Sequence, residues 1–273
     1  MDNNKMKRYI TIAMLAVIII AIMYNKILGL CLTVCFIIYK SYTSRASIIA
    51  LKAHKAFKQD KRDESIALFE KAYHTKGCTM RDKITYGFIL LKYADVNKAS
   101  EVFTKLMSEK MDDKDSNMIK SNYAMVLWKQ GKLEEAISLL KELYKTYKTT
   151  ALYGTLGAFL IEKGDLDEAY SFIQESYDYD NNDKVILDNL GQIYYLRGEN
   201  KKALEVFKKL MALNPHFPEA YYDYGKALMK EGENQKALEL SREALSKEFT
   251  NLSTITKDDV DKQIKLLEYS VGE

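Results

Sequence analysis

Apolar residues follow two different patterns along the 273-residue chain. Residues 9–24 and 27–39 carry no charge and are almost continuously apolar, whereas the chain from residue 46 onwards mixes apolar and charged positions. The first pattern is typical of segments that face lipid, and the second is typical of amphipathic helices that bury one face. Only two prolines and twelve glycines interrupt the chain. The pattern therefore predicts an all-α protein with an apolar N-terminal part.

The part of the chain after residue 46 repeats itself. In each of six segments an alanine or serine follows a polar turn, and these markers are spaced by 34, 37, 33, 34 and 34 residues. The markers are Ser65, Ala99, Ala136, Ala169, Ala203 and Ala237. A period of this length indicates stacked helix pairs, because one pair cannot bury its apolar face alone. The longest step coincides with a polar insertion at residues 112–115, which we expect to be a solvated loop.

Aligned on these markers, the segments resemble the tetratricopeptide repeat, which is a pair of antiparallel helices. Twelve residues before each marker comes a small residue of the first helix, namely Ala53, Gly87, Ala124, Gly157, Gly191 or Gly225. Four residues after each marker comes a large apolar residue, except for Ser241 in the last segment. The resemblance implies a superhelical solenoid of six helix pairs. Its units are residues 46–79, 80–113, 117–150, 150–183, 184–217 and 218–251.

Residues 252–273 are expected to form a capping helix and a tail. Val260 and Leu267 share one helical face, and Thr256 with Asp259 has the spacing of a capping box at the start of the helix. A solenoid needs such a terminal helix, because the apolar face of its last pair would otherwise be exposed.

The apolar N-terminal part predicts a membrane anchor. Each uncharged stretch is short for a helix that needs about 20 residues to cross a bilayer. Two spans, about residues 9–24 and 27–42, nevertheless leave Lys26 in a turn, whereas one long helix would hold it in mid-membrane at a cost of a few kcal/mol. We therefore favour a transmembrane helical hairpin that breaks at Asn25 and Lys26. A single span over about residues 17–39 is the alternative.

Basic residues lie before the first span and after the second, and only Lys26 lies between the spans. The flanking residues are Lys5, Lys7, Arg8, Lys40, Arg45 and Lys52. The positive-inside bias therefore predicts that residues 1–45 anchor the chain in the cell membrane with the solenoid on the cytoplasmic side. A single span would place the solenoid on the other side, where the alternative function is the assembly of envelope or secreted components.

No arrangement of catalytic or ligand-binding residues stands out. The chain lacks a phosphate-binding loop, a dinucleotide fingerprint, an HExxH sequence and a CxxC pair, and its three histidines lie in the first and fifth units. Residues 46–273 contain 35 basic and 37 acidic residues, so nucleic acid is not an expected partner. We expect no enzyme activity, no cofactor, no metal and no small-molecule substrate. An enzyme or a transporter subunit is the alternative from another class.

In the tetratricopeptide repeat family the first helices line a concave groove, and the resemblance implies that a partner binds there. The residues expected to contact the partner are Phe57, Phe88, Leu91, Met125, Trp128, Ile161, Tyr195 and Tyr222. Lys58, Lys92 and Lys129 at the rim favour an amphipathic helix or an extended segment with some acidic character. The sequence thus predicts a membrane-anchored scaffold or adaptor for an unidentified protein or peptide, which contacts the bilayer through residues 9–42.

Overall fold

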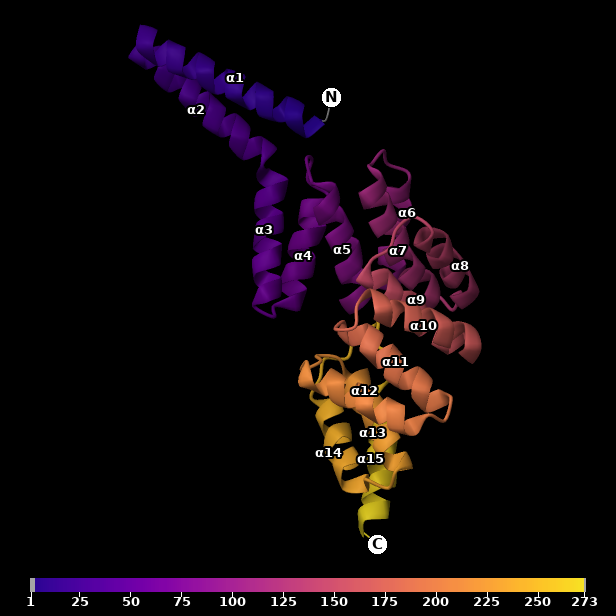
Figure 1. Cartoon of the computed structure of the whole chain (residues 1–273). Coiled ribbons are helices and arrows are strands. Elements are labelled where there is room, and N and C mark those ends of the chain that lie inside the picture. The colour runs from indigo at the N-terminus through magenta and orange to yellow at the C-terminus, as the bar shows by residue number, and fades with distance from the viewer. Residues whose placement is uncertain (1–2, 273) are drawn as a thin grey trace. The chain divides into compact units, whose positions relative to one another are not determined.

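The computed structural model describes residues 3–272, and within that range it consists of fifteen α-helices with no strand (Figure 1). The helices are α1 (Asn3–Tyr24), α2 (Lys26–Thr43), α3 (Arg45–Lys58), α4 (Arg62–Tyr73), α5 (Met80–Tyr93), α6 (Val96–Met107), α7 (Asp113–Lys129), α8 (Leu133–Tyr144), α9 (Thr150–Lys163), α10 (Leu166–Tyr179), α11 (Lys184–Leu196), α12 (Asn200–Ala212), α13 (Pro218–Lys230), α14 (Asn234–Leu245) and α15 (Lys257–Gly272). They belong to two compact units, one up to Tyr86 and one from Gly87. The prediction of an all-α solenoid of helix pairs is confirmed.

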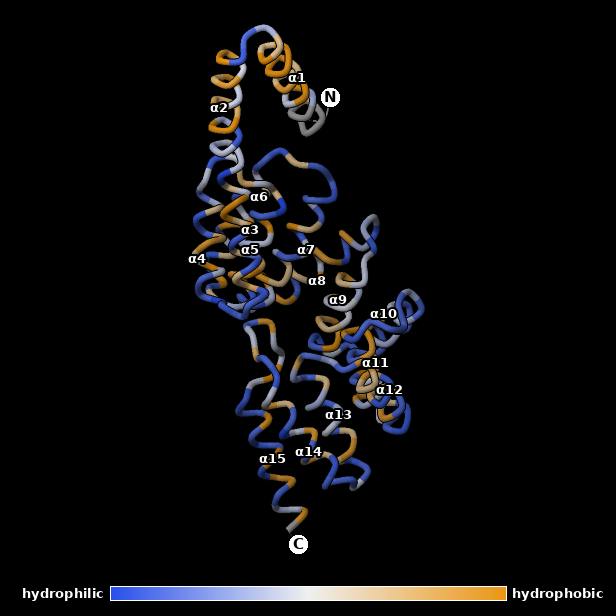
Figure 2. Tube along the Cα trace, turned by 90° about the vertical axis from the view of Figure 1, so that its left-hand side faces the viewer, coloured by the Kyte–Doolittle hydropathy of each residue, from blue (hydrophilic) through white to orange (hydrophobic). Residues whose placement is uncertain are grey.

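In the N-terminal unit, α1 and α2 lie side by side as a helical hairpin (Figures 1 and 2). The Asn25 side chain caps α2, because its Oδ1 accepts hydrogen bonds from the N–H groups of Ile27 (2.9 Å) and Leu28 (3.2 Å). The helices approach closely at Gly29, where a Cβ would lie 2.3 Å from Ile22 Cγ1. The chain therefore breaks where the sequence predicts, and one continuous helix over the apolar region is wrong.

One helix in the described part of the chain, α2, is long and apolar enough to cross a membrane, and it lies near the N-terminus. The apolar part of α1, Tyr9–Tyr24, is shorter than a span usually is. Figure 2 shows both helices as largely hydrophobic. Their large apolar side chains are mostly exposed, for example Ile20 and Leu30, which expose 66% and 65% of their surface. The membrane anchor stays a prediction, because length and composition alone do not establish it.

A small residue on the first helix packs against a large one on the second in the α5–α6 and α11–α12 pairs. A Cβ on Gly191 of α11 would lie 2.6 Å from Phe207 Cε1 of α12, so no larger residue fits without movement of the ring. Gly87 and Phe103 have the same relation in the α5–α6 pair, at 2.8 Å. Phe207 and Phe103 are completely buried. The spacing of small and large residues in the sequence thus corresponds to direct packing within these two pairs.

The polar insertion is not the solvated loop that the sequence suggests. Residues 113–115 form the first turn of α7, and Asp112 Oδ1 accepts a 2.8 Å hydrogen bond from the Asp115 N–H. Carboxylates near a helix N-terminus satisfy its free N–H groups and interact well with the helix dipole. The extra residues therefore lengthen the first helix of this pair.

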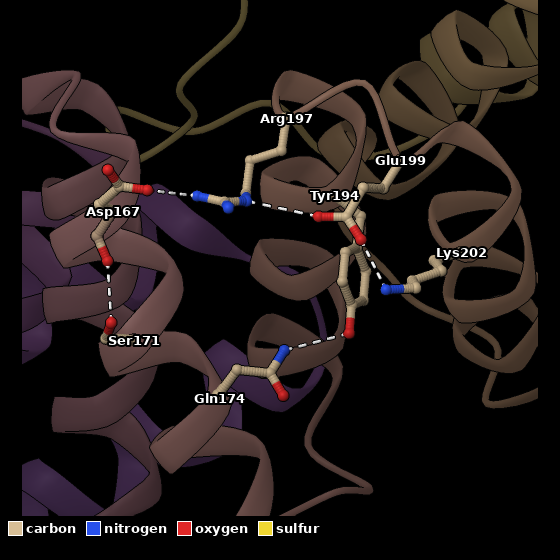
Figure 3. A network of polar contacts seen from close by, with 7 residues as sticks. All are labelled: Asp167, Ser171, Gln174, Tyr194, Arg197, Glu199 and Lys202. Carbon is tan, nitrogen blue, oxygen red and sulfur yellow. Dashed lines mark hydrogen bonds and ion pairs between the residues drawn. The ribbon is translucent and has the colours of Figure 1, made fainter.

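Polar side chains on the outside join the α9–α10 pair to the α11–α12 pair (Figure 3). The Arg197 guanidinium donates to Asp167 Oδ1 (2.6 Å) and to Glu199 Oε1 (3.4 Å). The Gln174 amide donates to the Tyr194 hydroxyl at 3.1 Å. The contacts of Arg197 with Asp167 and of Gln174 with Tyr194 add polar links to the apolar packing between the two pairs.

The last helix, α15, covers the end of the solenoid. Val260 and Leu267 are completely buried, and the Thr256 N–H and Asp259 N–H exchange hydrogen bonds with the opposite side chains, as in a capping box. The Gln263 amide donates to Ser241 Oγ at 3.0 Å. The small polar residue at the deviant position of the last repeat therefore has a partner on the capping helix.

The segment between α14 and α15, residues 246–256, runs back to the end of α5, and we call it the strap. The Asn251 N–H donates to the carbonyl oxygen of Lys92 (3.0 Å). Its side-chain amide donates to the carbonyl oxygens of Leu91 (3.1 Å) and Ala94 (3.3 Å). The strap therefore ties the last repeat to the first helix pair of the C-terminal unit.

Candidate binding groove

A groove of about 1050 Å³ lies within the C-terminal unit, and we call it the central groove. Its walls come from the first helices of four successive pairs, α7, α9, α11 and α13, and from the strap. Because α11 contacts both α9 and α13, residues one repeat apart in the sequence reach the same cavity.

The eight residues predicted as partner contacts fall into three groups. Those that line the central groove are Met125, Trp128, Ile161 and Tyr222. Phe88 and Tyr195 are partly exposed outside this lining, and Phe57 belongs to the N-terminal unit. Leu91 has no exposed surface. The expectation that Leu91 contacts a partner is therefore wrong, because its side chain is enclosed in the core.

Trp128 makes its polar contact within the protein. Its indole N–H donates to Glu162 Oε2 at 2.8 Å, and the ring centre of Phe159 lies 5.2 Å away. The Lys129 Nζ lies 4.3 Å from the centre of the indole ring. Burial lowers the pKa of Lys129. This lysine, predicted to draw an acidic partner, is therefore partly buried against Trp128.

Three carboxylates of α11 and α13 line the groove: Asp188, Glu219 and Asp223. All are buried, with exposed fractions of 9%, 9% and 5%. Asp223 accepts hydrogen bonds from the Gln192 amide (3.4 Å) and from Lys226 Nζ (3.3 Å). The interior of the groove is thus acidic at the end formed by α11 and α13.

The three carboxylates differ in how well they are satisfied. Glu219 Oε1 accepts a 2.8 Å hydrogen bond from the Thr254 N–H of the strap. Asp188 Oδ1 is buried and has no hydrogen-bond partner among the described residues. A buried carboxylate oxygen that lacks a donor destabilises the folded protein, because it has lost its water without replacement. Asp188 is therefore the least satisfied of these three acids.

These surroundings shift the pKa values of the acids and of Lys226. Burial raises the pKa of Asp188 well above 3.8; the charges of Asp223 and Glu219 raise it further, against the effect of Lys226. Burial also raises the pKa of Asp223 to about 6, again against Lys226. For Lys226, burial lowers the pKa, but Asp223 and Tyr222 outweigh it and the net shift is upward. One lysine thus compensates several carboxylates.

The groove is more acidic than the sequence suggests. Six carboxylates and three lysines line it. The expectation of an acidic partner rested on the rim lysines alone, and the buried carboxylates argue against it. Asp188 lies 34 residues, one repeat, before the predicted contact Tyr222, and this spacing is the signal that could have revealed it. It did not show that Asp223, 35 residues later, faces the same cavity.

The described residues contain no group of three His, Cys, Asp or Glu side chains placed to hold a metal ion. The arrangement of the groove is suited to non-covalent binding, with apolar side chains toward α7 and α9 and carboxylates toward α11 and α13.

Two family models match the chain. One, described as a tetratricopeptide repeat-like domain, matches residues 16–193, and one described as a TPR repeat matches residues 191–232. The Photosystem I assembly protein Ycf3 of Acaryochloris marina is 29% identical over 101 residues, which are 37% of this chain and 58% of that protein. The chain therefore spans less than two thirds of this relative.

Solved structures share the fold. The TPR protein TTC0263 of Thermus thermophilus matches with a TM-score of 0.55 at 18% identity, over 70% of this chain and 100% of its own. PilF of Pseudomonas aeruginosa matches with a TM-score of 0.58 at 12% identity, over 86% of this chain and 100% of its own. At these identities the likeness concerns the fold alone.

Proposed function

Because the chain belongs to the tetratricopeptide repeat-like family, whose members mediate protein–protein interactions, we propose that it binds an extended segment of a partner protein in the central groove. The observation that carries this proposal is the groove itself. Its volume of about 1050 Å³ lies just above the range for small-molecule sites, which is roughly 300–1,000 Å³. The strap forms one wall, which favours an extended segment over a helix. Binding involves no bond-making step.

A peptide-display selection on the immobilised full-length chain tests groove binding. The central residue to change is Ala158 of α9, which is partly exposed and lines the groove. The larger side chain in Ala158→Trp fills the groove, and we expect it to lower the affinity for the selected peptides by about tenfold or more. Thr104→Trp, on the exposed face of α6, is the matched control and leaves binding unchanged. Equal binding to both variants would place the peptide site on another surface.

We also propose that the hairpin of α1 and α2 anchors the protein in the cell membrane, with the solenoid on the cytoplasmic side. The exposed apolar side chains of both helices support this. Within the hairpin, Lys40 Nζ donates to Thr11 Oγ1 at 2.8 Å, so this lysine has a polar partner. The anchor explains why so much apolar surface faces outward in this unit.

Extraction of membrane fractions with alkaline carbonate tests the anchor. We expect the full-length chain to stay in the pellet, and the variant Leu30→Lys with Ile37→Lys to be released, since both side chains are exposed on α2. Release of the unmodified chain by salt alone contradicts the anchor. A reporter fused to the C-terminal end, active in one compartment only, then determines the side. Activity outside the cytoplasm would support the alternative role in assembling envelope or secreted components.

A further inference from the structure

The central groove contains a buried carboxyl group with an oxygen that lacks a hydrogen-bond donor. Asp188 of α11 exposes only 9% of its surface, lines the groove and has no hydrogen-bond donor at Oδ1. The neighbouring acids are satisfied, because Asp223 is bound by Lys226 and Gln192, and Glu219 by the strap. Asp188 therefore differs from the other buried acids of the groove.

The cations nearest to the acidic end are already engaged. Lys226 Nζ lies 3.3 Å from Asp223 and 5.3 Å from the ring centre of Tyr222. Lys129 lies over Trp128 on the other side of the groove, on α7. Among the described residues, no lysine or arginine forms an ion pair with Asp188. Acidic side chains thus outnumber cations where α11 meets α13, with three carboxyl groups beside Lys226.

Such an excess has a clear chemical complement. A carboxylate that is buried beside other carboxylates is unfavourable in the empty protein, and a cation that enters removes the repulsion. Hydrogen bonds between a carboxylate and an ammonium or guanidinium group are shorter and stronger than neutral ones. A guanidinium group can also donate to two carboxylates at once, because its five N–H groups point in fixed directions.

We propose that Asp188, with Asp223 beside it, forms a subsite that binds the ammonium or guanidinium group of a lysine or arginine side chain on the bound peptide. This subsite rests on the proposed binding of a peptide in the central groove. Met125 and Ile161, toward α7 and α9, offer apolar contacts to other residues of the same peptide. The partner segment is therefore basic with apolar neighbours, in contrast to the acidic segment that the rim lysines suggest.

Binding of peptide pools to the full-length chain, purified in detergent, tests the subsite. Each pool is a set of dodecapeptides with the central residue fixed as Arg, Lys, Ala or Glu and the other positions drawn from uncharged residues. We expect the Arg and Lys pools to bind about tenfold more tightly than the Ala pool, and the Glu pool to bind most weakly. Asp188→Asn removes this preference. Asp178→Asn, the same change at an exposed position of α10 outside the groove, keeps it.

The outcomes separate the subsite from the proposed function. Equal binding of the Arg and Ala pools, or an unchanged preference in Asp188→Asn, overturns the subsite; groove binding then stands if Ala158→Trp still weakens every pool. Binding that survives Ala158→Trp, or no binding by any pool, overturns the proposed function and the subsite with it. The far-ultraviolet circular dichroism of Asp188→Asn checks its folding, which we expect to be intact because the change removes a buried charge and keeps the shape.

Discussion

The replacement Asp188→Asn should make the empty protein more stable at neutral pH. Asp188 is buried, its Oδ1 lacks a donor, and Asp223 and Glu219 repel its charge. Asparagine has nearly the same shape but no charge, so it relieves the repulsion without leaving a cavity. A carboxyl group whose pKa is raised by one unit on folding costs about 1.4 kcal/mol of stability when it is ionised. We therefore expect the free energy of unfolding to rise by about 1–3 kcal/mol.

The neighbouring acid shows the scale of such a cost. A pKa of about 6 for Asp223, against 3.8 for a free side chain, is a shift of roughly two units and corresponds to about 3 kcal/mol. Burial is the largest cause of this shift, and the charge of Glu219 adds to it against Lys226, so the cost at Asp223 remains in the variant. For a unit of this length, 1 kcal/mol changes the midpoint of thermal unfolding by roughly 2–4 °C. Circular dichroism at 222 nm measures both quantities.

The gain should shrink as the pH falls. A carboxyl group whose pKa is raised by folding stabilises the protein below its ordinary pKa, and this stability is lost as the pH rises through the folded-state value. Asp188 and Asp223 both follow this rule, with Glu219 and Lys226 as the other charged groups beside them. Between pH 7.5 and 5.5 the unmodified chain should therefore gain stability relative to Asp188→Asn.

Two results would refute this reasoning. If Asp188→Asn is neutral or destabilising at pH 7.5, the carboxylate makes a favourable contact in the folded protein and is not an unsatisfied charge. If the difference between the two proteins does not change with pH, the charge of Asp188 is not its cause. Asp178→Asn serves as the control, and as an exposed substitution it should change the stability by less than about 0.5 kcal/mol.

Three further substitutions test how the solenoid is held together. Gly191→Ala should lower the free energy of unfolding, measured in urea, by about 1–3 kcal/mol, because its Cβ would lie 2.6 Å from Phe207 Cε1. If this contact is the cause, Phe207→Leu recovers part of the loss. An unchanged free energy of unfolding in Gly191→Ala would show that the contact does not limit the residue at this position. Asn251→Ala removes the two hydrogen bonds that the side-chain amide donates, so amide hydrogen exchange should become faster in the strap but not in α11. Unchanged exchange would mean that the hydrogen bond from the Asn251 N–H to Lys92 is sufficient to hold the strap. Arg197→Ala should lower the free energy of unfolding by no more than about 1 kcal/mol, because its partner Asp167 exposes 92% of its side chain. A larger loss of stability in thermal unfolding would mean that the outer polar network is essential.

The helix pairs of this protein could be predicted from the sequence because each depends on residues close together in the chain. The period of about 34 residues places a small residue on one helix opposite a large one on the next, as Gly191 and Phe207 show. The break at Asn25 likewise follows from a local capping contact. The prediction of a loop at residues 112–115 is wrong, since acidic residues occur at the start of a helix as readily as in a loop.

The binding groove was predicted only in part. Met125 and Tyr222 line it, as lining positions in single repeats suggest, whereas the enclosure of Leu91 was not foreseen. Its enclosure in the core depends on the packing around it, which a lining position in one repeat does not describe. No local pattern marks residues 246–256 as the strap.

The repeat period by itself determined that the chain forms stacked helix pairs, because a pair can hide its apolar face only against the next. The tertiary structure alone decided what the groove contains. The contact of α11 with α13 brings Asp188 and Asp223 to one cavity, and the sum of small rotations over several repeats brings Asn251 to the end of α5. That sum depends on every interface between pairs, so it cannot be derived from any one segment of the chain.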